Sequence, residues 1–303
     1  MTDAPIIILG FGRSGTTWIS DIVSKVLGKL VLFEPLHPSV NEESRHYSYA
    51  SCVDGQGMAP YLRRVLAKEH RRPWLMRNHV PVPLKDIDPS FVDLLWDQCE
   101  IAGFKEIRAN FVIPWLAQTL SRRIVFIVRD PFAVVASIRR RLNFWEFGWP
   151  GTYELLVDRN LANQAYDSIP AIPALREQAK RIDSDVERIA LMWAITHAVA
   201  LDDMERLGLP VFHYEDFYLS PFETTRRMFA HLGHGSPHIH PAHIFTPSMT
   251  THKTLHGFYE FDRRIEVRNL DFFWREVLNE ADQAAIRRIV APLNLQHLYG
   301  HLA

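Results

Sequence analysis

A short apolar segment that ends in a glycine-rich loop constrains the fold of this chain more than any other feature. Residues 6–9 are continuously apolar, as expected for a strand buried on both faces of a parallel sheet. A loop at 10–17 follows, and the apolar residues at 18–27 recur at helical spacing. Leu30–Phe33 predicts the next strand. This strand, loop, helix and strand form a βαβ unit, so the sequence predicts an α/β fold with a central parallel sheet flanked by helices.

The rest of the chain continues this alternation of strands and helices. Further strands are predicted at residues 74–76, 104–107, Ile124–Val128 and Val211–His213, and further helices at 61–69, 91–102, 115–120, 131–138, 187–207, 221–232 and 280–289. Residues 142–183 are instead rich in aromatic residues and proline, including Trp145 and Trp149, which indicates an insertion that forms a lid or a small subdomain. We therefore expect one domain over residues 1–303 that carries this insertion.

The composition argues against several classes of protein. The formal charge is −1 and the isoelectric point is near 7.0, so the chain as a whole does not favour nucleic acid or an anionic membrane surface as a partner. The apolar runs are too short for a membrane span, and the N-terminus lacks the features of a signal peptide. The two cysteines, Cys52 and Cys99, fit neither a metal spacing nor a disulfide framework. We expect a soluble cytoplasmic protein, and nothing in the sequence indicates its oligomeric state.

The glycine-rich loop predicts an anion-binding site, because the backbone N–H groups at a helix N-terminus face whatever lies above them. Three kinds of site share this geometry. The loop of nucleoside triphosphate-binding proteins needs a lysine after its last glycine, and here Thr16 follows Gly15. A dinucleotide fingerprint fits Gly10, Gly12 and Gly15, and Glu34 follows the second strand at nearly the required distance. A Rossmann-type NAD(P)-dependent oxidoreductase therefore remains an alternative at this point.

The residues that complete the loop favour a third kind of site. In order they are Arg13, Ser14, Gly15, Thr16 and Thr17, with Trp18 next. They resemble the loop with which sulfotransferases bind the 5′-phosphosulfate group of their donor, where a basic residue, Ser-Gly and a pair of threonines precede a helix. A donor with two separated phosphates needs a second anion site on a neighbouring strand end.

A second segment resembles the 3′-phosphate site of the same family. Arg129 ends a predicted strand, Asp130 and Pro131 begin a helix, and Ser137 lies about two helical turns later. Residues 104–108, 110–120 and 214–217, together with Trp274 and Arg275, also resemble the carbohydrate sulfotransferase branch. The likeness covers most of the chain outside 38–100 and 142–183. It implies a P-loop-like sulfotransferase fold.

The resemblance also implies a reaction and its co-substrate. The donor would be 3′-phosphoadenosine 5′-phosphosulfate (PAPS), and the sulfo group would pass by in-line displacement to a hydroxyl of a carbohydrate, glycolipid or other metabolite. Arg13 would contact the bridging and leaving oxygens, as a catalytic and donor-binding residue. Ser14, Gly15, Thr16 and Thr17 would hold the 5′-phosphate. Arg129 and Ser137 would bind the 3′-phosphate, and Asp130 would cap its helix.

Sulfuryl transfer also needs a base for the acceptor proton. Glu34, followed by proline, resembles the Glu-Pro of carbohydrate sulfotransferases and is the first candidate. His37 lies three residues later and is a further catalytic candidate that could orient the acceptor. His79 imitates the catalytic histidine of the small-molecule branch, but a predicted strand at 104–107 intervenes before the 3′-phosphate strand. Arg108, at the end of that strand, is a candidate contact for an anion or the acceptor.

No metal is expected in this site. Histidines at 231, 234, 238, 240 and 243 include pairs at ligand-like spacing, but no carboxylate or cysteine joins them, and prolines and glycines mark a loop. The expected partner is a small-molecule or carbohydrate acceptor, and nucleic acid is not expected. A noncatalytic protein of the same fold, which binds nucleotide or a partner protein, also remains an alternative.

Overall fold

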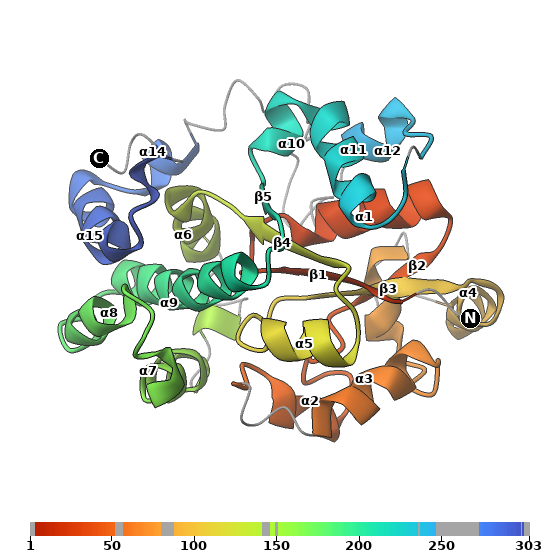
Figure 1. Ribbon diagram of the computed structural model, residues 1–303, viewed down its shortest axis with the longest axis horizontal. Helices are drawn as coiled ribbons and strands as arrows, with labels where there is room; N and C mark the ends of the chain where they lie inside the picture. The colour runs from red at the N-terminus through yellow and green to blue at the C-terminus, as the bar shows by residue number, and fades with distance from the viewer. Residues whose placement is uncertain are drawn as a thin grey trace.

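The computed structural model describes residues 4–51, 57–79, 88–140, 146–148, 151–235, 237–246, 273–297 and 299. These residues form one five-stranded parallel sheet with helices on both faces (Figure 1). The strands are β1 (Ile6–Gly10), β2 (Leu30–Phe33), β3 (Ile101–Glu106), β4 (Ile124–Val128) and β5 (Val211–His213), in the order β2-β3-β1-β4-β5. The predicted α/β fold with a central parallel sheet is therefore confirmed.

The helices form two layers because successive side chains of each strand point to opposite faces. One face carries α1 (Thr16–Leu27), α10 (Asp216–Leu219), α11 (Pro221–His231) and α12 (Pro241–Phe245), which pack on a cluster that includes Ile6 and Ile8. The other face carries α3 (Met58–Leu66), α5 (Ile113–Thr119), α6 (Pro131–Arg139), α9 (Asp185–Arg206) and α15 (Glu280–Val290), which pack on a cluster that includes Ile7 and Leu9. Figure 1 shows the sheet between these layers.

Further helices surround the two layers. They are α2 (Glu42–Tyr47), α4 (Pro89–Gln98), α7 (Arg159–Leu161), α8 (Ile172–Ala179) and α14 (Phe273–Val277). The described part of the insertion at 142–183 is helical and packs on α9 through α8 and the π-helical turn Glu154–Asp158. Trp145 and Trp149, which were singled out there, lie outside the described residues. Within the described ranges, no helix is both long and apolar enough to cross a membrane.

Two predicted elements were wrong. Residues 74–76 are not a strand but part of the 3-10 helix Pro73–His79, where Trp74 packs against the ring of Phe33 instead of joining a strand ladder. The helix predicted at 91–102 ends at Gln98, because the backbone after it enters the sheet: Leu30 donates to the carbonyl of Glu100, and β3 begins at Ile101. Apolar periodicity alone did not separate these segments.

The strand order decides between two interpretations of the glycine loop. In the dinucleotide-binding fold the second strand lies beside the first, so that the acidic residue at its end reaches the ribose. Here β3 lies between β2 and β1, with Leu9 beside Glu106 and Phe33 beside Lys105. Glu34 is thereby separated from the loop by the end of a different strand. This order argues against the Rossmann-type oxidoreductase.

Candidate functional site

The loop after β1 leaves the N-terminus of α1 open. Gly15 is the N-cap residue in the left-handed region (φ 85°), no side chain caps the helix, and its first turn carries no acidic residue. Arg13 is also left-handed, at φ 69°. The hydroxyl of Ser14 is fully buried and has no hydrogen-bond partner among the described atoms. Uncapped N–H groups, a positive helix end and an unsatisfied buried hydroxyl together fit a bound anion.

Two aromatic rings lie against the glycines of this loop. A Cβ atom at Gly15 would lie 2.3 Å from ring carbons of Tyr214, and one at Gly12 would lie 2.3 Å from a ring carbon of Phe147. Phe147, from the insertion, also stacks on Phe11 with ring centroids 4.6 Å apart. Only glycine allows these close approaches, so the insertion and the end of β5 both shape the loop.

The residues predicted for the two phosphates lie next to one another. The Nε atom of Arg13 donates to the Oγ atom of Ser137 at 2.9 Å, and the guanidinium of Arg129 donates to the carbonyl of Arg13 at 3.0 Å. The Cζ atom of Arg129 lies 4.2 Å from the ring centroid of Tyr214. β1 and β4 are neighbours in the sheet, with Gly10 beside Ile127, and this register brings the two segments together.

Helix α6 differs from α1 at its N-terminus. The carboxylate of Asp130 accepts hydrogen bonds from the backbone N–H groups of Phe132 at 2.7 Å and Ala133 at 3.3 Å. The predicted capping role of Asp130 is therefore confirmed. Because a carboxylate already occupies this helix end, an anion near β4 would depend on side chains such as Arg129 and Ser137.

Glu34 lies in a buried cluster of four charged side chains at the ends of β2 and β3. Its carboxylate forms ion pairs with Lys105 and, at 2.9 Å, with Arg108. Arg108 also contacts Glu106 at 3.1 Å. Glu106 in turn accepts hydrogen bonds from the backbone N–H groups of Leu36, Ile107 and Arg108, at 2.7, 2.8 and 3.0 Å, so it ties the segment after β2 to the end of β3.

These ion pairs govern the protonation of Glu34. Burial by itself would raise the pKa of its carboxyl group, but the charges of Lys105 and Arg108 and their hydrogen bonds outweigh burial and lower the pKa to about 2. A carboxylate with this pKa is a weak proton acceptor. Glu34 can therefore accept a proton from a substrate efficiently only if its two cations also interact with another anion.

His37 lies close enough to this cluster for its charges to act on the ring, but unlike Glu34 it carries no charge near pH 7. Its ring stacks on Trp74 with centroids 3.7 Å apart, and its Nδ1 atom accepts a hydrogen bond from the backbone N–H of Ser39 at 3.0 Å. Burial and the charge of Arg108 lower the pKa of His37 to about 3. The ring is therefore neutral near pH 7, with its proton on Nε2, where it can donate a hydrogen bond to an acceptor.

The structure does not bring His79 to this cluster. Its Nε2 atom lies 3.1 Å from the carbonyl of Val31, near the start of β2, whereas Glu34 follows the end of that strand. Histidines 231, 234 and 240 have other contacts: the carbonyl of Ile124, the guanidinium of Arg123 and the N-terminus of α12, respectively. In the part of the chain that the structure describes, no three His, Cys, Asp or Glu side chains are grouped as a metal site.

Sequence reasoning had assigned no site role to Phe147, Lys105, Glu106, Tyr214 or Glu215. Tyr214 and Glu215 directly follow a correctly predicted strand, so the rule that ligands gather at the carboxyl ends of parallel strands could have pointed to them. Lys105 and Glu106 lie inside a predicted strand, where alternation would have placed both in packed layers. The position of Phe147 against Gly12 could not be predicted, because nothing in the sequence around Phe147 specifies this contact.

A comparison with models of protein families identifies the family of this chain. A sequence model described as "Sulfotransferase family" matches residues 5–236. No curated protein gives a match. The similar solved structures include a sulfotransferase domain from the curacin biosynthetic pathway (12% identity, TM-score 0.48, 96% of this chain and 97% of that chain). They also include one from the olefin synthase of Synechococcus PCC 7002 (16% identity, TM-score 0.45, 96% and 94%).

Proposed function

The chain belongs to the sulfotransferase family, and on that premise we propose that it transfers a sulfo group from PAPS to a hydroxyl of a carbohydrate, glycolipid or other metabolite. One observation carries the proposal: the uncapped N-terminus of α1 adjoins Arg13, which is hydrogen-bonded to Ser137 on α6 and to Arg129 at the end of β4. Two anion sites on adjacent strands match a donor that carries a 5′-phosphosulfate and a 3′-phosphate.

The donor would bind along the edge formed by β1 and β4. The N–H groups of Gly15, Thr16 and Thr17, with the hydroxyl of Ser14, would hold the 5′-phosphate. Arg129 and Ser137 would hold the 3′-phosphate. Arg13 reaches Ser137 and also belongs to the loop, so it would serve both ends of the donor. The buried hydroxyl of Ser14 and the uncapped N–H groups at the start of α1 support this placement of the 5′-phosphate.

The charged cluster on the other side of the loop would hold the acceptor. In the proposed reaction the acceptor oxygen attacks sulfur, the bond from sulfur to the 5′-phosphate oxygen breaks, and that phosphate keeps the electron pair. The acceptor proton passes to a base. Arg13 and the N-terminus of α1 would stabilise the charge that develops on the leaving phosphate, as positioned cations do in phosphoryl transfer.

Glu34 is the proposed base, with a condition that its ion pairs impose. With Lys105 and Arg108 on its two oxygens, Glu34 remains ionised but weakly basic. A sulfo group nearby would share these cations, and the pKa of Glu34 would then rise toward its ordinary range. The neutral His37, with its proton on Nε2, would orient the acceptor oxygen rather than remove its proton.

A panel of nucleotides tests the proposal before any acceptor is known. Thermal unfolding is measured with 3′-phosphoadenosine 5′-phosphate, called the bisphosphate below, and with ATP and NAD(P)H. Specific stabilisation by the bisphosphate is expected, by about 2.7 kcal/mol at a hundredfold excess over Kd. Stabilisation by NAD(P)H without stabilisation by the bisphosphate would overturn the proposal. A noncatalytic protein would bind the bisphosphate but release none from PAPS with any acceptor. The cytoplasmic location and the absence of a metal requirement stay predictions.

A further inference from the structure

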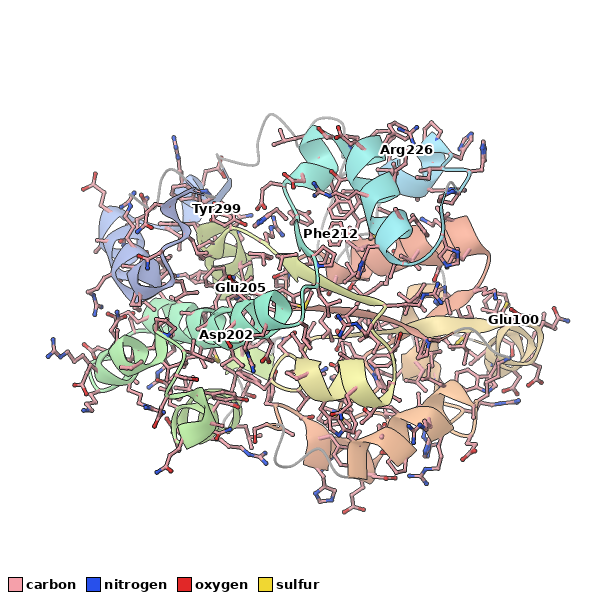
Figure 2. The ribbon with its side chains drawn as sticks, viewed as in Figure 1. Glu100, Asp202, Glu205, Phe212, Arg226 and Tyr299 are labelled. Atoms are coloured by element: carbon pink, nitrogen blue, oxygen red, sulfur yellow. The ribbon has the colours of Figure 1, made fainter. Side chains whose placement is uncertain are left out.

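Glu215 links three segments at the carboxyl edge of the sheet. It lies two residues after β5. One carboxylate oxygen accepts a hydrogen bond from the backbone N–H of Asp130 at 3.0 Å, and the other accepts from the hydroxyl of Tyr299 at 3.3 Å. Tyr299 is buried and comes from the chain after α15, on the side of the molecule opposite Glu100 (Figure 2). The carboxylate therefore joins the end of β5, the turn after β4 and the C-terminal segment.

The N–H group that Glu215 holds belongs to the peptide between Arg129 and Asp130. Asp130 caps α6, and α6 carries Ser137. A shift of this peptide would move the guanidinium of Arg129 and the start of the helix that carries Ser137. Glu215 therefore acts on this peptide through its hydrogen bond and on the guanidinium of Arg129 through its charge.

Glu215 is partly buried, and the groups around it hold its carboxylate in place. Burial raises the pKa of its carboxyl group to about 6, against the opposing effects of the Asp130 N–H and of Arg129. The carboxylate of Asp130, the guanidinium of Arg129 and the hydroxyl of Tyr299 are the charged and titratable groups that act on it, and His213 contacts Tyr299 at 3.4 Å. Two hydrogen-bond donors on this partly buried carboxylate hold it in a single orientation.

We propose that Glu215, held in place by Tyr299, is a positioning residue for the 3′-phosphate site. It fixes the peptide between Arg129 and Asp130, and thereby lets the protein distinguish a nucleotide with a 3′-phosphate from one without it. This inference rests on the proposed function, because it presupposes that Arg129 and Ser137 bind that phosphate.

The test compares two ligands that differ only in the 3′-phosphate. Isothermal titration gives the affinity for the bisphosphate and for adenosine 5′-phosphate in wild type and in three variants. Glu215→Leu leaves the Asp130 N–H without its acceptor and should weaken the bisphosphate about tenfold, with adenosine 5′-phosphate changed less than about twofold. Glu215→Gln retains an acceptor for this N–H, so it should keep most of the wild-type ratio between the affinity for the bisphosphate and the affinity for adenosine 5′-phosphate. Tyr299→Phe should lower the ratio about threefold.

Tyr166→Phe is the matched control. The Tyr166 hydroxyl donates to the carbonyl of Phe111 at 3.3 Å, the same length as the Tyr299 bond, but Tyr166 lies in the insertion. Its removal should leave the ratio unchanged. Equal losses for both ligands, or an unchanged ratio in a folded Glu215→Leu protein, would overturn the inference. If Glu215→Leu does not fold, the ratio of the two affinities is compared between Tyr299→Phe and Tyr166→Phe. Equal ratios in these two variants would overturn the inference. A wild type that does not prefer the bisphosphate overturns the proposed function itself.

Discussion

Arg13 donates a hydrogen bond to Ser137 at 2.9 Å, although 124 positions separate the two residues in sequence. The contact joins the loop after β1 to the helix after β4. It forms because those strands are parallel neighbours, so their carboxyl ends lie together. The two segments proposed to bind phosphates are thus adjacent, and the bond between Arg13 and Ser137 connects them.

This contact predicts coupling between the two residues in donor binding. Arg13→Ala and Ser137→Ala should each weaken the bisphosphate about tenfold, because each removes a donor to a phosphate oxygen. The double variant should lose less than the product of the two, with a coupling free energy of about 0.5–1.5 kcal/mol. Titration calorimetry on the four proteins measures this quantity. Strict additivity would show that the residues act on the ligand independently.

Glu34→Gln separates catalysis from binding. The amide keeps the shape of the side chain but cannot take the acceptor proton, so sulfo transfer should fall roughly 100-fold or more. Affinity for the bisphosphate should stay within about threefold, because Glu34 follows β2 and not the donor strands. Release of the bisphosphate from PAPS with a panel of sugar and lipid alcohols measures the rate. Full activity in this variant would remove Glu34 from the role of base.

The same residue predicts how stability changes in acid. The pKa of Glu34 is lowered from 4.5 to about 2 in the folded chain, so its ionised form favours folding. Its contribution is fully present above about pH 4.5 and is lost as the pH falls toward 2. The free energy of unfolding, from urea titrations at several pH values, should therefore fall more steeply for wild type than for Glu34→Gln in this range. If the free energy of unfolding fell equally with pH in both proteins, the ion pairs of Glu34 would not stabilise the fold.

Gly12→Ala tests the contact between the loop and the insertion. The added methyl group would lie 2.3 Å from the ring of Phe147, so the ring or the loop must move. We expect a loss of about 1–3 kcal/mol in stability and weaker bisphosphate binding. Phe147→Ala should remove the clash, so the double variant should bind the bisphosphate better than Gly12→Ala alone. Thermal unfolding with and without the bisphosphate measures both effects. Failure of the second change to restore binding would place the damage in the loop itself.

The sequence predicted the strands of this fold well because buried parallel strands are short apolar runs between polar segments. Residues 6–9 and 124–128 needed no tertiary information. Arg13 and Arg129 were chosen because the loop after β1 and the end of β4 resemble the donor sites of sulfotransferases, and their roles stay predictions. The helix and strand between 73 and 102 were less clear, since their short apolar runs fit either state.

The neighbours of Glu34 could not be predicted in this way. Its ion pairs with Lys105 and Arg108 depend on β3 lying between β2 and β1, and strand order is not a local property of sequence. A carboxylate chosen as a base thus proved to be held by two cations. The same limit applies to Tyr299, whose contact with Glu215 spans 84 positions and depends on where the C-terminal segment packs.

The central place of β1 in the sheet has a practical consequence for engineering. The proposed donor contacts follow β1 and β4, whereas the charged cluster lies at the ends of β2 and β3. A protein designer could therefore exchange residues 35–51 and 57–79, which follow β2, to alter the proposed acceptor site without changing the segments after β1 and β4. Such chimaeras would have to preserve the parallel pairing of β1 with β3.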